Sequence, residues 1–202
     1  MTKQWLKDHK QDSYYKRAKI EGYRSRAAYK LMEIHKRFRL FRLGYIVLDL
    51  GAAPGGWSQV ATKLVGKTGM VIGIDLSPIK PLINENTIFI KGDMTDNSVI
   101  EQIKKITNNA PINIVLSDAA PNISGNYSVD QAKSIYLAEN AIYIAEQVLA
   151  KNGKLVVKVF EGQDFQNFIK RVKEKFRKYR IFSPKASRAR SSEVYIIGEG
   201  FM

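Results

Sequence analysis

Short apolar runs alternate with amphipathic segments along most of the chain. The runs lie at 46–50, 70–75, 87–91, 112–118 and 154–160 and are rich in Ile, Val and Leu. Runs of this length and composition are typical of strands that are buried on both faces of a parallel sheet. Segments with helical spacing lie between or after them, at 57–65, 97–107, 128–150 and 163–176. Ser128 and Gln131 have the spacing of a capping box, which predicts that the third of these helices starts at Ser128. This alternation predicts an α/β fold with helices on both faces of a parallel sheet.

The pattern changes on either side of this central region. Before it, an apolar stripe formed by Ala27, Leu31, Ile34 and Phe38 predicts a helix over 25–39, with Ser25 as its cap. After it, 178–183 and 193–198 have the composition of strands and are joined by a basic loop, which predicts an antiparallel pair at one edge of the sheet. No repeat or linker divides the chain, so we expect one domain over residues 1–202.

A turn rich in glycine follows the first predicted strand. Gly51, Pro54, Gly55 and Gly56 separate that strand from the helix expected at 57–65. Such a strand, turn and helix form a crevice at the carboxyl end of the strand, where glycine lets the backbone approach a ligand closely. The spacing G-x-x-x-G-G differs from the dinucleotide fingerprint G-x-G-x-x-G, which disfavours a diphosphate ligand and a dehydrogenase.

Charged residues stand at the ends of several predicted strands, where they would face this crevice. Asp75 could accept both hydroxyls of a ribose, Asp93 could accept from an adenine amino group, and Asp118 ends the fourth strand. Lys158 lies inside an apolar strand, where a lysine is seldom buried without a partner or a purpose, the alternative being an edge lysine whose amine reaches water. Glu193 opens the last strand.

The net charge of +14 is concentrated in two blocks. Residues 1–42 hold 13 Lys and Arg against 4 acidic residues, and residues 170–190 hold 10 against 1, so each block carries +9. The region between them is close to neutral. Two basic blocks around a neutral centre indicate a polyanion-binding surface, with solvated surface charge as the alternative.

Several basic and aromatic residues in these blocks are candidates for contacts with a nucleic acid. The planar, forked guanidinium group of arginine suits phosphates, and each basic block contains two candidate arginines. Three tyrosines of the N-terminal block could stack on bases or could equally belong to the core. These residues are Arg24, Arg26, Arg188 and Arg190, and Tyr14, Tyr15 and Tyr23.

Other classes of function are excluded or disfavoured. The chain has no Cys, which excludes disulfides, thiol nucleophiles and Cys-ligated metals. No apolar run reaches the length of a membrane-spanning helix, and the polar N-terminus does not resemble a signal peptide, so we expect a cytoplasmic protein that does not contact membranes. His9 and His35 lie in basic surroundings that favour solvated side chains over metal ligands, and no metal site is expected.

Five segments of the chain resemble the FtsJ/RlmE family of ribosomal RNA 2′-O-methyltransferases, over residues 13–198. They are YRSRAAYK at 23–30, DLGAAPGGW at 49–57, SDAAPNISG at 117–125, VVKVF at 156–160 and SRARSSEVY at 187–195. The resemblance implies a Rossmann-like fold whose seven-stranded sheet is mostly parallel with the last strand antiparallel. It also implies S-adenosylmethionine as cofactor. The implied catalytic tetrad is Lys30, Asp118, Lys158 and Glu193, and the implied cofactor contacts are Gly55, Trp57, Asp75, Asp93 and Asp118.

The implied reaction is methylation of a ribose 2′-oxygen, expected to be that of a uridine, in large-subunit ribosomal RNA. Lys158 would be the general base, and it would have to lose its proton near neutral pH, whereas an ordinary lysine has a pKa of about 10.4. Lys30 and the cofactor's sulfonium favour that loss, while Asp118 and Glu193 oppose it. We therefore expect cofactor binding to tip the balance, unless Lys158 is a charged donor that only positions the hydroxyl.

The basic lead, residues 1–24, is expected to contact RNA, and the protein is expected to be a monomer. Two alternatives remain open at this stage. One is a methyltransferase for ribose in tRNA anticodon loops. The other is a factor for ribosome assembly that binds RNA and does not turn over.

Overall fold

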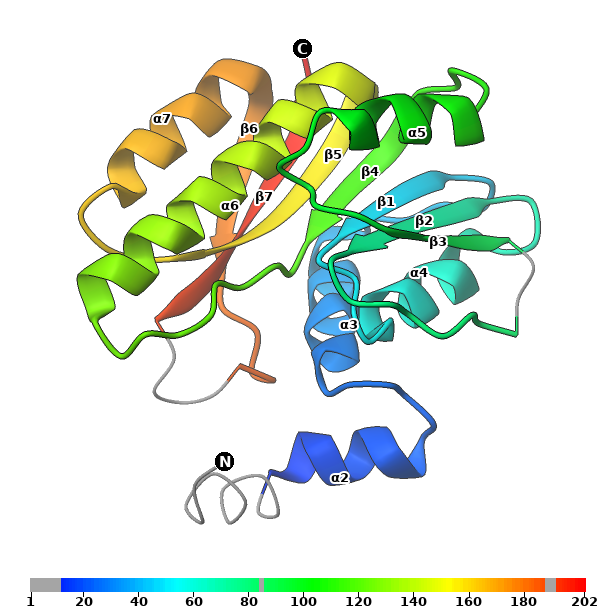
Figure 1. Ribbon diagram of the computed structural model, residues 1–202, viewed down its shortest axis with the longest axis horizontal. Helices are drawn as coiled ribbons and strands as arrows, with labels where there is room; N and C mark the ends of the chain where they lie inside the picture. Colours follow the sequence, from blue (N-terminus) through cyan, green and yellow to red (C-terminus); the bar gives the residue numbers. More distant parts are fainter. Residues whose placement is uncertain (1–11, 84–85, 188–191) are drawn as a thin grey trace.

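The computed structural model describes residues 12–83, 86–187 and 192–202 (Figure 1). A seven-stranded sheet forms its centre, in the order β3-β2-β1-β4-β5-β7-β6. β7 pairs antiparallel with both of its neighbours, and the other pairings are parallel, as expected. The strands are β1 (Ile46–Leu50), β2 (Met70–Asp75), β3 (Thr87–Lys91), β4 (Ile112–Ser117), β5 (Leu149–Phe160), β6 (Phe176–Phe182) and β7 (Glu193–Phe201).

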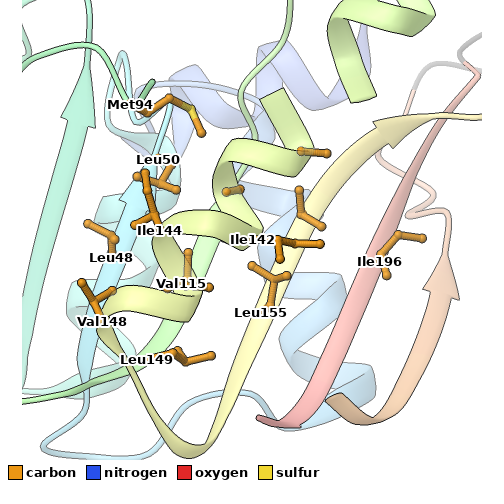
Figure 2. Close-up of a cluster of buried hydrophobic side chains, with 14 of the residues drawn as sticks. Leu48, Leu50, Met94, Val115, Ile142, Ile144, Val148, Leu149, Leu155 and Ile196 are labelled. Carbon is orange, nitrogen blue, oxygen red and sulfur yellow. The ribbon is translucent and has the colours of Figure 1, made fainter. Parts of the chain in front are cut away.

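Helices cover both faces of this sheet. Because side chains alternate between the faces along each strand, each strand packs against helices on both sides. Val47 packs with the residues of α3 and α4, whereas Leu48 and Leu50 pack with those of α5, α6 and α7. Figure 2 shows the second of these clusters, where Ile142 and Ile144 of α6 lie among residues of β1, β4 and β5. The helices are α2 (Ser13–Ile20), α3 (Ala27–Phe38), α4 (Gly56–Val65), α5 (Ser98–Ile106), α6 (Tyr127–Val148) and α7 (Phe165–Lys175).

Two predicted helix caps were wrong. α3 begins at Ala27 after Arg26, and Ser25 does not cap it. α6 begins at Tyr127, because the Asn126 side chain accepts hydrogen bonds from the backbone N–H groups of Ser128 and Val129 and so makes an earlier cap than the one we expected. The capping-box spacing was therefore a coincidence of sequence.

β5 is longer than predicted, since it begins directly after α6 rather than at residue 154. Leu149 pairs with Ile112, the register then shifts, and regular pairing with β4 resumes between Lys154 and Ile114. The irregular stretch contains Asn152 and Gly153, which are poor strand formers, so the strand signal in the sequence starts only after them.

The basic lead contains a helix, α2, that the sequence pattern did not reveal. The carboxylate of Asp12 caps it by accepting a hydrogen bond of 3.1 Å from the N–H of Tyr15. Ala18 of this helix packs against Tyr29 of α3 and Ala186. None of the helices in the described part of the chain is long and apolar enough to cross a membrane.

Candidate active site

The glycine-rich turn lies between the ends of β2 and β4. The N–H groups of Gly51 and Ala52 both donate to the carbonyl of Ile74, at 2.9 and 3.0 Å. A Cβ at Gly51 would lie 2.7 Å from the backbone of Ala119, so the loop after β4 can approach this closely only because residue 51 is glycine. The turn therefore packs directly against the loop that carries Asp118.

A cavity of about 390 Å³ opens at the carboxyl ends of the parallel strands. This is where open α/β sheets bind their ligands, and the volume lies in the range of small-molecule sites. The cavity brings together three carboxylates that the sequence predicted, those of Asp75, Asp93 and Asp118. Its lining consists of Gly51, Ala53, Ile74, Asp75, Leu76, Asp93, Met94, Asp118, Ala119, Ala120 and Leu137.

The backbone holds two of these carboxylates in place. Asp75 accepts from the N–H of Ala53 at 2.9 Å and from the N–H of Ser77 at 2.8 Å. One oxygen of Asp93 accepts from both the N–H and the hydroxyl of Thr95, and its other oxygen has no hydrogen-bond partner among the residues that the structure describes. Carboxylates of this kind can accept hydrogen bonds from the amine and hydroxyl groups of S-adenosylmethionine, and their negative charge attracts its sulfonium, so the residues present fit that cofactor.

The other two predicted cofactor contacts, Gly55 and Trp57, do not line this cavity. Trp57 is 3% exposed, its indole N–H donates to the carbonyl of Ala27 at 2.7 Å, and its ring centre lies 5.7 Å from that of Tyr195. Gly55 is the N-cap of α4 and lies beside Arg24. Both residues support the walls of the site, and their direct contact with a cofactor stays a prediction.

Asp118 joins the cavity to the predicted catalytic residues. The amine of Lys158 lies 3.0 Å from Oδ1 of Asp118 and donates to its backbone carbonyl at 2.6 Å. The hydroxyl of Tyr195 donates to the same carboxylate oxygen at 2.7 Å. Lys158 and Tyr195 are paired residues of β5 and β7, so they project from the same face of the sheet.

The remaining two predicted residues form a second ion pair beside the first. The amine of Lys30, on α3, donates to the carboxylate of Glu193 at the start of β7. That amine also lies 5.7 Å from the centre of the Tyr195 ring. The structure therefore brings all four residues of the predicted tetrad together, as two ion pairs with Tyr195 between them.

Tyr195 was missed by the sequence analysis. A signal was available, since Tyr195 is two residues after Glu193 in a strand and must share its face. Burial raises the pKa of Tyr195 well above its usual value, and the nearby Asp118 and Glu193 add to this effect. Tyr195 therefore remains a hydrogen-bond donor at neutral pH.

The charge state of Asp118 follows from opposing effects. Burial alone would raise the pKa of this carboxyl group, but the charges of Lys158 and Lys30 and the hydrogen bond from Tyr195 outweigh burial and lower it. Asp118 is therefore ionised at neutral pH. It presents a negative charge to the cavity and to Lys158 at once.

The two described arginines among the predicted phosphate contacts are engaged within the protein. Arg24 donates to the backbone carbonyls of Pro54, Lys80 and Pro81. Arg26 donates to the carboxylate of Asp12 and to the carbonyl of Ala186. Arg188 and Arg190 lie outside the described residues.

The aromatic and metal-ligand candidates are placed as follows. Tyr14 and Tyr23 pack against the small core cluster around Tyr29, whereas Tyr15 is 40% exposed. The ring of His35 packs against Phe41. Burial lowers the pKa of His35, and the nearby charge of Lys154 adds a smaller effect in the same direction. His9 lies outside the described residues, and within 12–83, 86–187 and 192–202 no group of three or more His, Asp or Glu could hold a metal ion.

Comparisons with known proteins agree with this geometry. Residues 23–201 match the model of a family described as FtsJ-like methyltransferase. The chain is 47% identical to the ribosomal RNA large subunit methyltransferase E of Acinetobacter baumannii, over 98% of this chain and 91% of that one. It is also 47% identical to the protein of the same name from Coxiella burnetii, over 100% and 96%.

Solved structures agree as well. A crystal structure from Plasmodium falciparum, assigned as a ribosomal RNA methyltransferase, superposes with a TM-score of 0.79 at 31% identity, over 89% of this chain and 98% of that one. A Clostridium thermocellum structure, assigned as an rRNA methylase, superposes with a TM-score of 0.58 at 20% identity, over 85% and 97%, and shows likeness of fold alone.

Proposed function

The chain belongs to the FtsJ-like methyltransferase family, and we propose that it methylates the 2′-oxygen of a ribose, that of a uridine, in large-subunit ribosomal RNA. The methyl donor in this proposal is S-adenosylmethionine. The observation that carries the proposal is the position of Asp118, which lines the cavity and also binds Lys158 and Tyr195. A single carboxylate thus adjoins both the space for a cofactor and the group that would take a proton.

The residues around the cavity would hold S-adenosylmethionine through its polar groups. Asp75 would accept the ribose hydroxyls and Asp93 the adenine amino group, because each ends or follows a strand at the edge of the cavity. Asp118 would stabilise positive charge at the reacting end. When bound, the cofactor supplies an electrophilic methyl group on a sulfonium.

The tetrad would align the RNA hydroxyl and remove its proton. Glu193, paired with Lys30, would hold the 2′-hydroxyl, and Lys30 and Asp118 would orient the oxygen and the methyl group. Lys158 would take the proton from the hydroxyl as general base. The amine of Lys158 lies 3.0 Å from Oδ1 of Asp118, so the group that would take the proton is held in an ion pair.

Cofactor binding would weaken this ion pair. A cation bound at the Asp118 end of the cavity would compete with the ammonium of Lys158 for the same carboxylate. If Lys158 is a base, the rate of the chemical step must rise with pH as the lysine loses its proton. A rate that stays flat from about pH 6 to 10, with chemistry limiting, would instead assign Lys158 to positioning.

The proposed substrate rests on the names of the relatives and on the basic lead. Both bacterial relatives are named for the large ribosomal subunit RNA. Lys16 and Lys19 are exposed on α2, and we propose that the lead contacts phosphates through such residues. An enzyme acting on assembling ribosomal subunits in bacteria works in the cytoplasm, which is the location we propose.

Transfer of labelled methyl groups tests the activity. The protein is incubated with labelled S-adenosylmethionine and, separately, with total RNA, tRNA and ribosomal subunits from cells that lack it. Label on a ribose 2′-oxygen of large-subunit RNA supports the proposal. Label confined to tRNA, or label in none of these substrates, contradicts it.

Substitution of Lys158 tests the mechanism. Lys158→Met keeps most of the side-chain volume in β5 but removes the amine, and we expect the turnover rate to fall about 10²–10⁴-fold because a general base contributes that much. RNA affinity should stay within about twofold, since the Lys158 side chain is only 7% exposed. Single-turnover methyl transfer and filter binding give the two values.

Lys154→Met is the matched control. Lys154 lies four residues earlier on the same face of β5, and its amine donates to the carbonyl of Arg39 at 3.1 Å, remote from the cavity lining. Methyl transfer should be retained in this variant. Full activity of Lys158→Met would eliminate the tetrad mechanism, and full support of the cellular role by an inactive Lys158→Met would favour an assembly factor.

A further inference from the structure

Arg24 connects three segments of backbone beside the cofactor cavity. Its guanidinium donates to the carbonyl of Pro81 at 2.6 Å, to that of Pro54 at 3.3 Å and to that of Lys80. Three carbonyls facing one guanidinium satisfy several of its donors within the protein. The side chain is therefore committed to backbone groups.

The segments that Arg24 connects form two walls of the cavity. Pro54 follows Ala53, which lines the cavity and donates to Asp75. Lys80 and Pro81 lie in the loop that follows β2, and both Asp75, at the end of β2, and Leu76, the next residue, line the cavity. Arg24 thus holds the glycine-rich turn and the loop after β2 together at the point where Asp75 is positioned.

Neighbouring residues hold Arg24 in this position. Gln59 of α4 accepts from the backbone N–H of Arg24 at 2.7 Å and donates to the carbonyl of Gly22 at 3.1 Å. A Cβ at residue 55 would lie 2.8 Å from the guanidinium nitrogen, so the glycine at the start of α4 leaves the space that the arginine occupies. Both observations indicate a fixed side chain.

We propose that Arg24 is a positioning residue for the cofactor cavity rather than a phosphate contact. It acts through Pro54, Lys80 and Pro81 on the turn and loop that place Asp75, and it does not itself touch the cofactor. This inference rests on the proposed binding of S-adenosylmethionine in the cavity. It assigns to the N-terminal basic block a role in cofactor affinity that net charge does not predict.

Arg24→Lys separates the two roles. Lysine keeps the positive charge that a phosphate contact needs, but its ammonium lacks the planar fork that reaches several carbonyls at once. We expect Arg24→Lys to weaken S-adenosylmethionine binding about tenfold or more, the loss of at least one charge-assisted hydrogen bond. RNA affinity should change less than about twofold, because phosphate binding follows the count of charges.

The experiment compares the full-length wild type, Arg24→Lys, Arg24→Ala and Lys19→Ala. Calorimetry gives the dissociation constant for S-adenosylmethionine, and filter binding gives that for large-subunit RNA. Lys19→Ala removes one exposed charge from the same lead, so it should weaken RNA binding alone. Both Arg24 variants should weaken cofactor binding and raise the KM for cofactor more than they lower kcat.

Hydrogen exchange without any ligand gives an independent measurement. Within residues 76–83, the backbone N–H of Ser77 donates to Asp75 at 2.8 Å. This amide should exchange about tenfold faster in Arg24→Lys than in the wild type, because the loop loses its connection to the turn. Wild-type cofactor affinity in Arg24→Lys would overturn the inference, and weakened RNA binding in Arg24→Ala would then assign Arg24 to a phosphate contact. An unchanged exchange rate in a folded variant would also overturn the inference.

The outcomes also separate this inference from the proposed function. A wild-type protein that does not bind S-adenosylmethionine refutes the proposed cofactor, whatever Arg24 does. Faster exchange at 76–83 in Arg24→Lys would still support the connection between turn and loop. A wild type that binds the cofactor and an Arg24→Lys variant that binds it equally well refute the inference alone.

Discussion

Asp49 is a buried acid that the proposed chemistry does not use. It lies on β1 with no exposed surface, and its Oδ2 accepts from the hydroxyl of Ser58 on α4 at 2.6 Å. Its Oδ1 has no hydrogen-bond partner among the described residues. Burial raises the pKa of Asp49 to about 7, the hydrogen bond from Ser58 partly offsets this, and Asp118 and Asp75 add to the rise. The native state therefore binds a proton here that the unfolded chain releases.

The sign and size of the resulting effect follow from linkage. A folded pKa above the unfolded value means that Asp49 contributes stability fully below about pH 4, and that this contribution is lost as the pH rises to about 7. A rise of about 3 units corresponds to roughly 4 kcal/mol. Asp49→Asn stays neutral and its amide oxygen can still accept from Ser58. The free energy of unfolding of the variant, relative to that of the wild type, should therefore rise by up to roughly 4 kcal/mol between pH 4 and 8.

Urea unfolding at several pH values from about 4.5 to 8.5 measures this difference. The difference between the two proteins is the informative quantity, because carboxylates that do not interact with Asp49 titrate equally in both. The stability difference should grow in favour of Asp49→Asn by about 1.4 kcal/mol per pH unit up to pH 7 and then level off. A difference that does not change with pH would refute the argument and would mean that Asp49 is ionised in the native state.

Two further predictions concern groups that contact Asp118 or the loop after it. Tyr195→Phe removes the hydrogen bond that helps keep the pKa of Asp118 low, so we expect the acid limb of the kcat profile to move to higher pH and kcat at pH 7 to fall less than about tenfold. Asp130 accepts from both the N–H and the hydroxyl of Ser124 and from the N–H of Gly125, which lowers its pKa. Its contribution to stability is therefore present at neutral pH and lost in acid. Asp130→Asn should be less stable than the wild type at pH 7 in urea unfolding, and the gap should narrow towards pH 3; a constant gap would contradict this.

The sheet and most of the site could be predicted from the sequence, for a physical reason. Strands buried on both faces are apolar runs, and their carboxyl ends meet at one edge, so Asp75, Asp93 and Asp118 had to lie close together. Lys158 was noticed because a charge inside such a run needs a partner. Asp118 is that partner, at 3.0 Å.

Other features depend on packing that periodicity does not encode. α2 has a weak apolar face, and its Ala18 packs against Tyr29 and Ala186, which are far apart in sequence. Trp57 follows the glycine-rich turn directly, and its ring lies in the core with its centre 5.7 Å from that of Tyr195. The direction of a side chain at a helix start is set by the neighbouring helix, which the local sequence does not specify.

The charge that the N-terminal block can present to RNA also depends on tertiary contacts that the sequence pattern does not encode. Arg17 pairs with Glu21, Arg26 with Asp12 and Lys30 with Glu193, while Arg24 is bonded to backbone carbonyls. An ion-paired cation releases fewer counterions on binding a phosphate, because its charge is already partly neutralised. The net charge of this block is therefore larger than the charge that is available to bind RNA phosphates. Its affinity should come instead from exposed lysines of α2 such as Lys19, since Arg17, Arg24 and Arg26 are engaged with groups of the protein itself.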